Sequence, residues 1–159
     1  PIVLSEFLTF AVRQSRAPDV PVLFDPADRS TVILADKRRL AQVIQNLIDN
    51  AAKYGDGATA VGFSVASSAV QIYVEDRGPG VPAADRERIF DRFTRAGADA
   101  GRREVAKGVG LGLSLVAEHV RLHHGRVWVT DRTDGSRGAR FIVELPIGDL
   151  ALLEEELAT

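Results

Sequence analysis

The residues best suited to chemistry lie between positions 46 and 54, where polar side chains recur at helical spacing. Asn46 and Asn50 are four residues apart, and Lys53 and Tyr54 follow three and four residues after Asn50. Side chains at these offsets share one face of a helix. That face would present neutral oxygens, an ammonium group and an aromatic ring, which together suit a metal-bound polyphosphate attached to a flat base. The alternative is that the asparagines only cap or bridge neighbouring loops.

A second candidate is the run Asp76-Arg77-Gly78-Pro79-Gly80, at the end of a predicted strand. The Asp76 carboxylate could accept a hydrogen bond from an exocyclic amine. Gly78 and Gly80 allow positive φ and the close approach of a flat ring. The alternative is a simple turn in which Asp76 accepts hydrogen bonds from the amides that follow it.

A third candidate is the run Gly108-Val109-Gly110-Leu111-Gly112-Leu113, which leads into a predicted helix. Free N–H groups at a helix N-terminus bind anions. The run lacks the Gly-Lys-Ser/Thr ending of a Walker motif, and no predicted strand precedes it as a dinucleotide fingerprint requires. The alternative is a glycine-rich hinge.

The segment 94–108 is predicted to be a mobile loop, because it is rich in Gly, Ala, Arg and Asp and has no apolar pattern. Phe90 and Phe93 are expected to anchor the start of this loop in the core. Arg92 and Arg95 lie where a cation could reach a terminal phosphate, and the alternative is that both are solvated.

The rest of the pattern predicts an α+β domain that positions these groups. Helices are expected over 5–16 with Ser5 as N-cap, over 37–54 with Asp36 as N-cap, over 82–93, and over 111–124 with Gly125 as the C′ residue. Strands are expected over 20–24, 30–35, 59–65, 69–76, 126–130 and 139–145. Because the helices alternate with antiparallel strand pairs, one mixed sheet should be covered on one face by helices.

The chain has 159 residues, of which 45% are hydrophobic and 26% charged, values typical of one globular domain. The net charge of −2 gives no electrostatic reason to expect nucleic acid, and the absence of cysteine excludes disulfides and thiolate metal sites. No apolar run is long enough to cross a bilayer. The start at Pro1 and the absence of methionine favour an excised fragment, with a domain over 1–148 and an acidic tail over 149–159.

The order and spacing of four motifs point to one family. These motifs are Asn46…Asn50-Ala-Ala-Lys53-Tyr54, Asp76-x-Gly78-x-Gly80, Phe90-x-x-Phe93 and Gly108-x-Gly110-Leu-Gly112-Leu113. Together they resemble the N, G1, F and G2 boxes of the ATP-binding catalytic domain of sensor histidine kinases, in the superfamily shared with gyrase, Hsp90 and MutL. The resemblance covers roughly residues 5–147. It implies a two-layer α/β sandwich of the Bergerat type, with a mixed, mainly antiparallel sheet, about three helices on one face, and a mobile ATP lid over 94–107.

By the same resemblance, ATP and Mg²⁺ are the cofactors. Asn50 ligates Mg²⁺ and Lys53 contacts phosphate, while Tyr54 packs near the adenine. Asp76 receives the adenine amine. Asn46 supports the same polar face and belongs, with Asn50 and Lys53, to the catalytic set. The remaining binding residues are Gly78 and Gly80 in the turn, and Lys107, Gly108, Val109, Gly110, Leu111, Gly112 and Leu113 around the phosphates.

The residue at position 46 bears on the type of reaction. The ATPases of this superfamily carry a glutamate four residues before the metal-binding asparagine, whereas Asn46 cannot take a proton at neutral pH. This favours phosphoryl transfer to a nucleophile from elsewhere, which in the family is a histidine followed by an acidic residue. His119, His123 and His124 do not have that sequence context and are interpreted as surface or helix-end histidines.

The resemblance therefore implies a protein-histidine kinase domain without its own phosphoacceptor. Its expected partners are a separate dimerisation domain that carries the histidine, and a response regulator. The parent protein would be a homodimer of the bacterial plasma membrane with this domain in the cytoplasm. No nucleic acid and no membrane contact are expected for the chain itself. Two alternatives stay open, namely a nucleotide-binding regulatory module without phosphotransfer and a gyrase-class ATPase.

Overall fold

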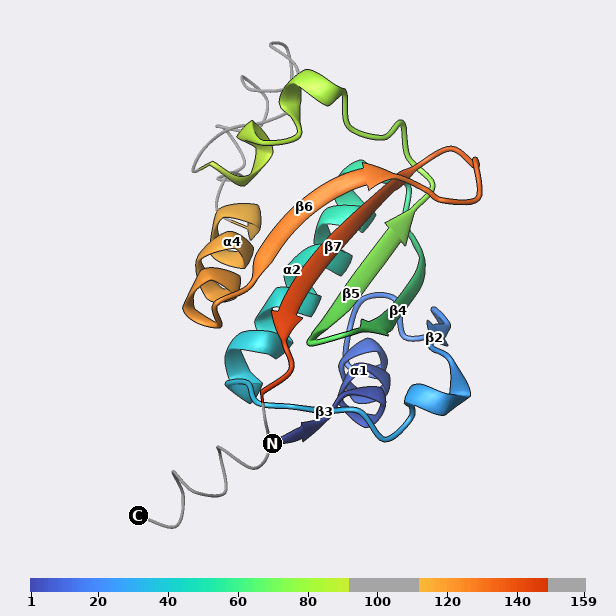
Figure 1. The fold of residues 1–159 in the computed structure, drawn as a ribbon. Helices are drawn as coiled ribbons and strands as arrows, with labels where there is room; N and C mark the ends of the chain where they lie inside the picture. Colours follow the sequence, from blue (N-terminus) through green and yellow to red (C-terminus); the bar gives the residue numbers. More distant parts are fainter. Residues whose placement is uncertain (92–111, 149–159) are drawn as a thin grey trace.

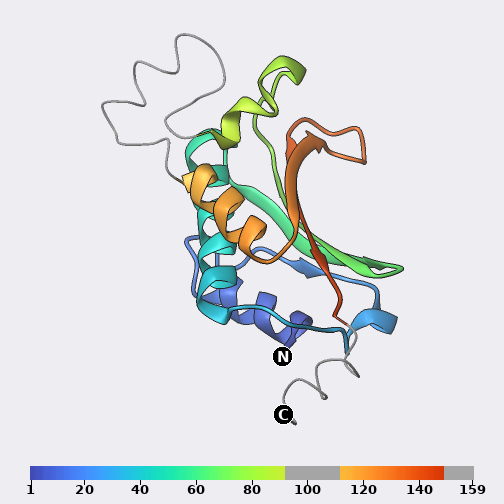
Figure 2. The same ribbon diagram turned by 60° about the vertical axis from the view of Figure 1, so that its left-hand side comes forward.

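The computed structural model describes residues 1–91 and 112–148, which form two layers. Helices make up one layer and a twisted sheet the other (Figures 1 and 2). The described helices are α1 (Leu4–Arg13), α2 (Lys37–Tyr54) and α4 (Gly112–Leu122). The described strands are β1 (Ile2–Val3), β2 (Val22–Leu23), β3 (Val32–Ile33), β4 (Ala58–Ala66), β5 (Ala69–Asp76), β6 (Arg126–Asp131) and β7 (Ala139–Pro146).

The main sheet has five strands in the order β2-β4-β5-β7-β6. All neighbours pair antiparallel except β2, which runs parallel to β4. The register places Ile72 opposite both Phe63 and Val143, and all three side chains are buried. The helices cover this face only (Figure 2), so the predicted α+β sandwich with a mixed, mainly antiparallel sheet is confirmed.

Helix α2 carries the candidate polar face, and its sequence explains its bounds. The Asp36 carboxylate caps the first turn by accepting a hydrogen bond from the backbone N–H of Arg39 at 3.1 Å, as predicted. The helix ends at Gly55, whose N–H donates to the carbonyl of Ala51 at 2.9 Å. Between these ends, the side chains of one stripe are buried: Leu40, Val43, Ile44, Leu47, Ile48 and Ala51. The core therefore fixes the rotation of α2 and with it the direction of the polar face.

The N-terminal part differs from the sequence prediction in two ways. Helix α1 begins at Leu4, and Ser5 is not its N-cap but a buried residue of the first turn whose Oγ donates to the carbonyl of Arg29 at 2.8 Å. The strands predicted over 20–24 and 30–35 are two residues long, and they do not pair with each other. Strand β2 pairs with β4, whereas β3 joins β1 in a separate two-stranded sheet. The apolar pattern located these strands, but their tertiary partners decided the pairing.

Two later elements also differ. The helix predicted over 82–93 is replaced, in its described part, by two short 3-10 turns, Ala83–Asp85 and Arg88–Phe90. The residue with left-handed backbone after α4 is His124, with φ 60°, rather than Gly125. A Cβ at Gly125 would overlap the carbonyl oxygen of Glu144, so glycine is needed there for close packing.

Several predicted features lie outside the described residues. These are the lid over 94–107, the tail over 149–159, and the side chains of Arg92, Phe93 and Arg95. Within the described ranges, no helix combines the length and the apolar character needed to span a bilayer.

Candidate functional site

The polar face of α2 lies opposite the stripe that enters the core. Asn46 and Asn50 are half-buried on this face, Tyr54 is half-buried at its end, and Lys53 is exposed. The Nδ2 atom of Asn46 is buried and, in the described part of the chain, has no hydrogen-bond partner. Buried polar groups are nearly always hydrogen-bonded, so an unsatisfied amide donor indicates a position where a ligand or water would bind.

Asp76 ends β5 with a side chain that is only 4% exposed. Its Oδ1 atom accepts two backbone hydrogen bonds, from the N–H of Gly78 at 3.0 Å and from the N–H of Ala139 at 2.9 Å. The turn interaction with Gly78 is the one that the simpler alternative predicted, but it occupies only one carboxylate oxygen. Among the described residues, Oδ2 is therefore the oxygen left to accept a donor from a ligand.

Glycines allow the end of β5 to pack directly on the end of α2. A Cβ at Gly55 would overlap the Asp76 carboxylate, and a Cβ at Gly78 would overlap the backbone of Gly55. The N–H of Arg77 donates to the carbonyl of Gly55 at 3.0 Å, which fixes this approach. Gly80 follows with φ 77°, the left-handed conformation predicted for the turn. The carboxylate and the polar face of α2 are therefore brought together by backbone contact.

Arg132 supports Asp76 from the β6–β7 hairpin, a contact that sequence reasoning missed. Its Nη1 donates to the carbonyl of Asp76 at 3.3 Å, and its Nη2 pairs with Asp134 at 3.1 Å. Burial raises the pKa of the Asp76 carboxyl above its ordinary value, while the N–H bonds from Ala139 and Gly78 and the Arg132 cation oppose this rise. The carboxyl is therefore an acceptor whose charge depends on its immediate partners.

The start of α4 completes the described part of the site. The ends of α2 and β5 and the first turn of α4 lie at the same end of the molecule (Figures 1 and 2). Gly112 begins α4, whereas the Leu113 side chain belongs to the core, so only the Leu113 backbone could face a ligand. Phe90 packs edge-to-face on Phe141, with 6.2 Å between ring centroids. The residues predicted around the phosphates from Lys107 to Leu111 lie outside the described ranges.

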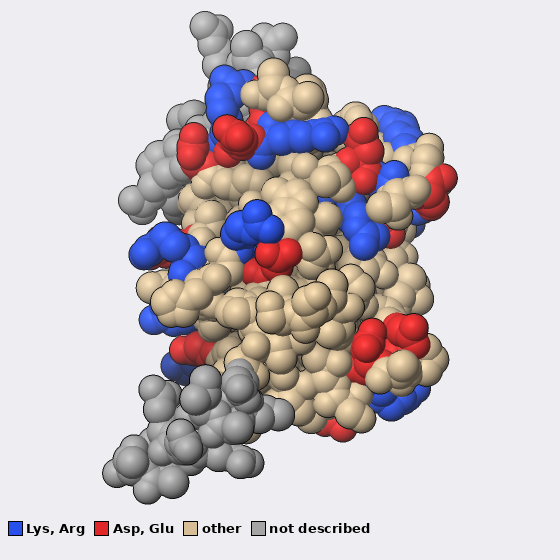
Figure 3. Space-filling view, in the orientation of Figure 1, with Lys and Arg blue, Asp and Glu red and all other residues tan. Residues whose placement is uncertain are grey.

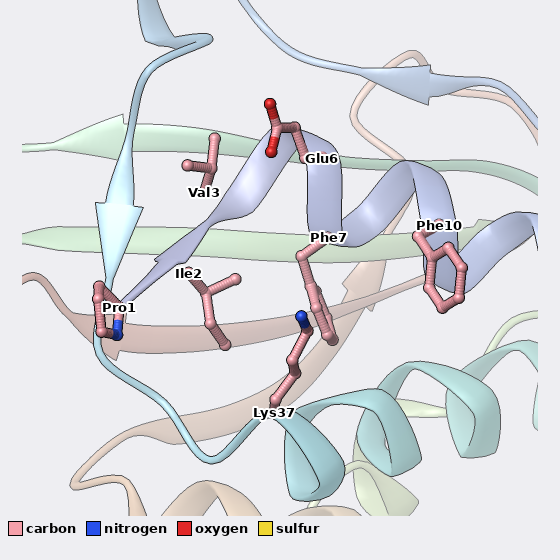
Figure 4. Close-up of a pocket in the computed structure, with 7 residues that line it drawn as sticks. All are labelled: Pro1, Ile2, Val3, Glu6, Phe7, Phe10 and Lys37. Atoms are coloured by element: carbon pink, nitrogen blue, oxygen red, sulfur yellow. The ribbon is translucent and has the colours of Figure 1, made fainter.

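Two other surface features lack these groups. A hollow of about 430 Å³ between α1 and the start of α2 is lined by apolar side chains such as Ile2 and Phe7, with Lys37 at its edge (Figure 4). On the open face of the sheet, acidic and basic side chains are interspersed (Figure 3), including the ion pair of Arg126 with Glu144 at 2.8 Å. Neither place combines amides, a buried carboxylate and glycine turns.

The sequence matches a known family over most of its length. Residues 35–149 match the family described as histidine kinase-, DNA gyrase B-, and HSP90-like ATPase. Over 118 residues the chain is 39% identical to the adaptive-response sensory kinase SasA of Nostoc sp. strain PCC 7120, covering 72% of this chain and 28% of that protein. The chain thus spans less than a third of the length of this relative.

Solved structures give the same assignment. The ATP-binding domain of PrrB from Mycobacterium tuberculosis has a TM-score of 0.69 at 30% identity, covering 93% of this chain and 96% of that domain. Full-length ShkA in complex with AMPPNP has a TM-score of 0.67 at 26% identity, covering 93% of this chain and 31% of that one. The chain therefore belongs to the histidine kinase-, DNA gyrase B- and HSP90-like ATPase family, as an ATP-binding domain of the sensor histidine kinase type.

Proposed function

We propose that this chain binds Mg-ATP beside the end of α2 and donates the γ-phosphoryl group to a histidine on a separate domain. The observation that carries the proposal is the Asp76 carboxylate, which is buried, bonded twice through Oδ1, and placed against Gly55 at the end of α2. A fixed acceptor of this kind suits the exocyclic amine of adenine, and the glycine turns leave room for a flat ring. ShkA, a structural neighbour, was crystallised with AMPPNP.

The polar face of α2 would hold the phosphates and the metal. Mg²⁺ prefers oxygen ligands, so the amide oxygen of Asn50 would hold the ion, which would neutralise charge on the transferring phosphoryl group. The unsatisfied Nδ2 donor of Asn46 fits a phosphate oxygen or a metal-bound water. The ammonium group of Lys53 would contact phosphate, and the ring of Tyr54 would flank the base. The first turn of α4 would offer backbone N–H groups to the phosphates.

Position 46 also favours transfer over hydrolysis. A hydrolase needs a base that orients and deprotonates water, and an asparagine amide cannot accept that proton at neutral pH. The acceptor would instead be a histidine on the dimerisation domain of the parent protein, and a response regulator would receive the group next. We propose a homodimeric parent anchored in the bacterial plasma membrane, with this domain over 1–148 in the cytoplasm and an acidic tail over 149–159.

The test combines binding with transfer. Calorimetry should detect Mg-ATP binding by the purified chain, and incubation with γ-labelled ATP should give no phosphohistidine on the chain alone. Adding the histidine-bearing dimerisation domain should produce acid-labile, base-stable phosphate on that domain. Absence of Mg-ATP binding would refute the proposal. Steady phosphate release by the chain alone would favour the ATPase alternative, and binding without transfer would favour the regulatory module.

A further inference from the structure

A histidine on α4 joins this helix to the start of α2. The Nδ1 atom of His123 lies 2.7 Å from the carbonyl oxygen of His119, and its Nε2 atom lies 2.9 Å from the backbone nitrogen of Asp36. A carbonyl oxygen can only accept and a backbone N–H can only donate, so Nδ1 carries the proton and Nε2 accepts. The two bonds therefore require a neutral imidazole in one tautomer.

A second contact between the same helices gives their register. His119 places its Nε2 atom 3.1 Å from Oε1 of Gln42. Between Gln42 and Asn50 α2 advances about 12 Å, and between His119 and Gly112 α4 advances about 10 Å in the opposite direction, at 1.5 Å per residue. The ladder of contacts that begins at His123 thus ends where the first turn of α4 meets the polar face of α2.

We propose that His123 is a positioning residue for the nucleotide site, because its neutral form sets the register of α4 against α2. This inference rests on the proposed binding of Mg-ATP between these two helices. Uptake of a proton at Nε2 would place a donor against the N–H of Asp36 and remove the bond. Nucleotide affinity is therefore expected to fall with pH in the range where imidazoles titrate.

The charged groups around His123 do not reverse this sign. The Asp36 carboxylate is already engaged by Arg39, through the backbone N–H at 3.1 Å and through Nε at 3.5 Å. The other nearby carboxylates are also paired with arginines, Glu118 with Arg121 on α4 and Glu144 with Arg126 on the neighbouring strands. Lys37 and Arg38, exposed at the start of α2, add positive charge. A protonated His123 would have to displace one of these pairs to gain an acceptor.

Substitutions at His123 separate the acceptor from the charge. His123→Gln keeps an oxygen near the position of Nε2 and cannot titrate, whereas His123→Leu removes the acceptor. His124→Asn is the matched control, because it removes the neighbouring exposed histidine and asparagine tolerates its left-handed backbone. Calorimetry gives the Kd for Mg-ATP between about pH 5.5 and 8, and dividing each value by that of the control cancels titration of the nucleotide and of Asp76.

The expected results are specific to each variant. At pH 8, His123→Leu should bind Mg-ATP about two- to ten-fold more weakly than the control, the cost of one hydrogen bond, and His123→Gln should bind like the control. At pH 5.5 the control should weaken relative to His123→Gln by a similar factor. In the nucleotide-free protein, ¹⁵N NMR should show the Nδ1–H tautomer at neutral pH.

Each contrary outcome has one meaning. If the wild-type chain bound no Mg-ATP, the proposed function would be wrong and this inference with it. Normal binding with one shared pH profile in all variants, or an Nε2–H tautomer, would overturn the inference alone. If His123→Leu failed to fold, the pH profile of His123→Gln would decide, because an unchanged profile there also refutes a role for the neutral imidazole.

Discussion

Replacing Asp76 with asparagine is expected to weaken ATP binding and to remove the preference for adenine over guanine. The carboxylate has two duties, since Oδ1 accepts the N–H groups of Gly78 and Ala139 and Oδ2 would accept the adenine amine. An asparagine has only one oxygen. If that oxygen keeps the two backbone bonds, the NH₂ group faces the adenine amine, and two donors meet. If the side chain flips, both backbone donors lose their acceptor.

The size of the effect follows from the bond that is lost. A hydrogen bond to a charged group contributes about 1.5–3 kcal/mol, which corresponds to roughly a 10- to 150-fold rise in the Kd for Mg-ATP. Guanine carries a carbonyl where adenine carries its amine, so the NH₂ group of the variant could donate to it. The ratio of the Kd for Mg-GTP to that for Mg-ATP should therefore fall toward one.

Calorimetry with both nucleotides measures this ratio, and urea unfolding measures stability. Because burial raises the pKa of the Asp76 carboxyl, the ionised form is disfavoured in the fold, and the stability it costs appears as pH rises through that pKa. The neutral Asp76→Asn variant should thus be as stable as the wild type at pH 7 or more so. An unchanged nucleotide ratio in a folded variant would refute the placement of adenine. A large loss of stability would refute the orientation of the side chain.

Three further substitutions test the surroundings of the site. Gly55→Ala puts a Cβ into the Asp76 carboxylate, so Mg-ATP binding measured by calorimetry should weaken while the circular dichroism spectrum is retained; unchanged affinity would contradict the close approach. Arg132→Gln removes a cation that opposes the raised pKa of Asp76, so the acidic limb of the binding curve should move to higher pH, and an unmoved limb would contradict the coupling. Leu47→Ala in the core should lower the free energy of unfolding by about 2–5 kcal/mol in urea, and a loss below about 1 kcal/mol would contradict its full burial.

Local sequence was sufficient where short-range interactions decide the structure. The Asp36 cap, the buried stripe of α2 and the β4–β5 hairpin depend on residues within a few positions of each other, and all three were predicted. The combination of Asn50, Asp76 and the glycine runs indicated the family, because each motif marks the end of an element at the same end of the fold. The roles of the individual residues stay predictions.

Long-range partners could not be read from the sequence. Ala139 and Arg132 meet Asp76 from 63 and 56 residues away, and neither lies in a motif. The bond between His123 and Asp36 spans 87 residues. The short strands β2 and β3 pair with β4 and β1 rather than with each other, a choice that depends on packing beyond their own residues. Apolar spacing specifies which face is buried, but it does not name the partner.

The placement of α1 has a consequence for the size of the smallest fragment that can fold. The family match begins at residue 35, yet Leu4 and Leu8 are fully buried and Phe7 is 6% exposed in the same core as α2. Gln45 of α2 also donates to the carbonyl of Ala11 at 2.9 Å. Burial of three such side chains contributes about 4–9 kcal/mol, comparable to the whole stability of a typical domain. A chain cut at residue 35 would lose this contribution and expose the α1-facing side of α2, although every motif of the nucleotide site would still be present.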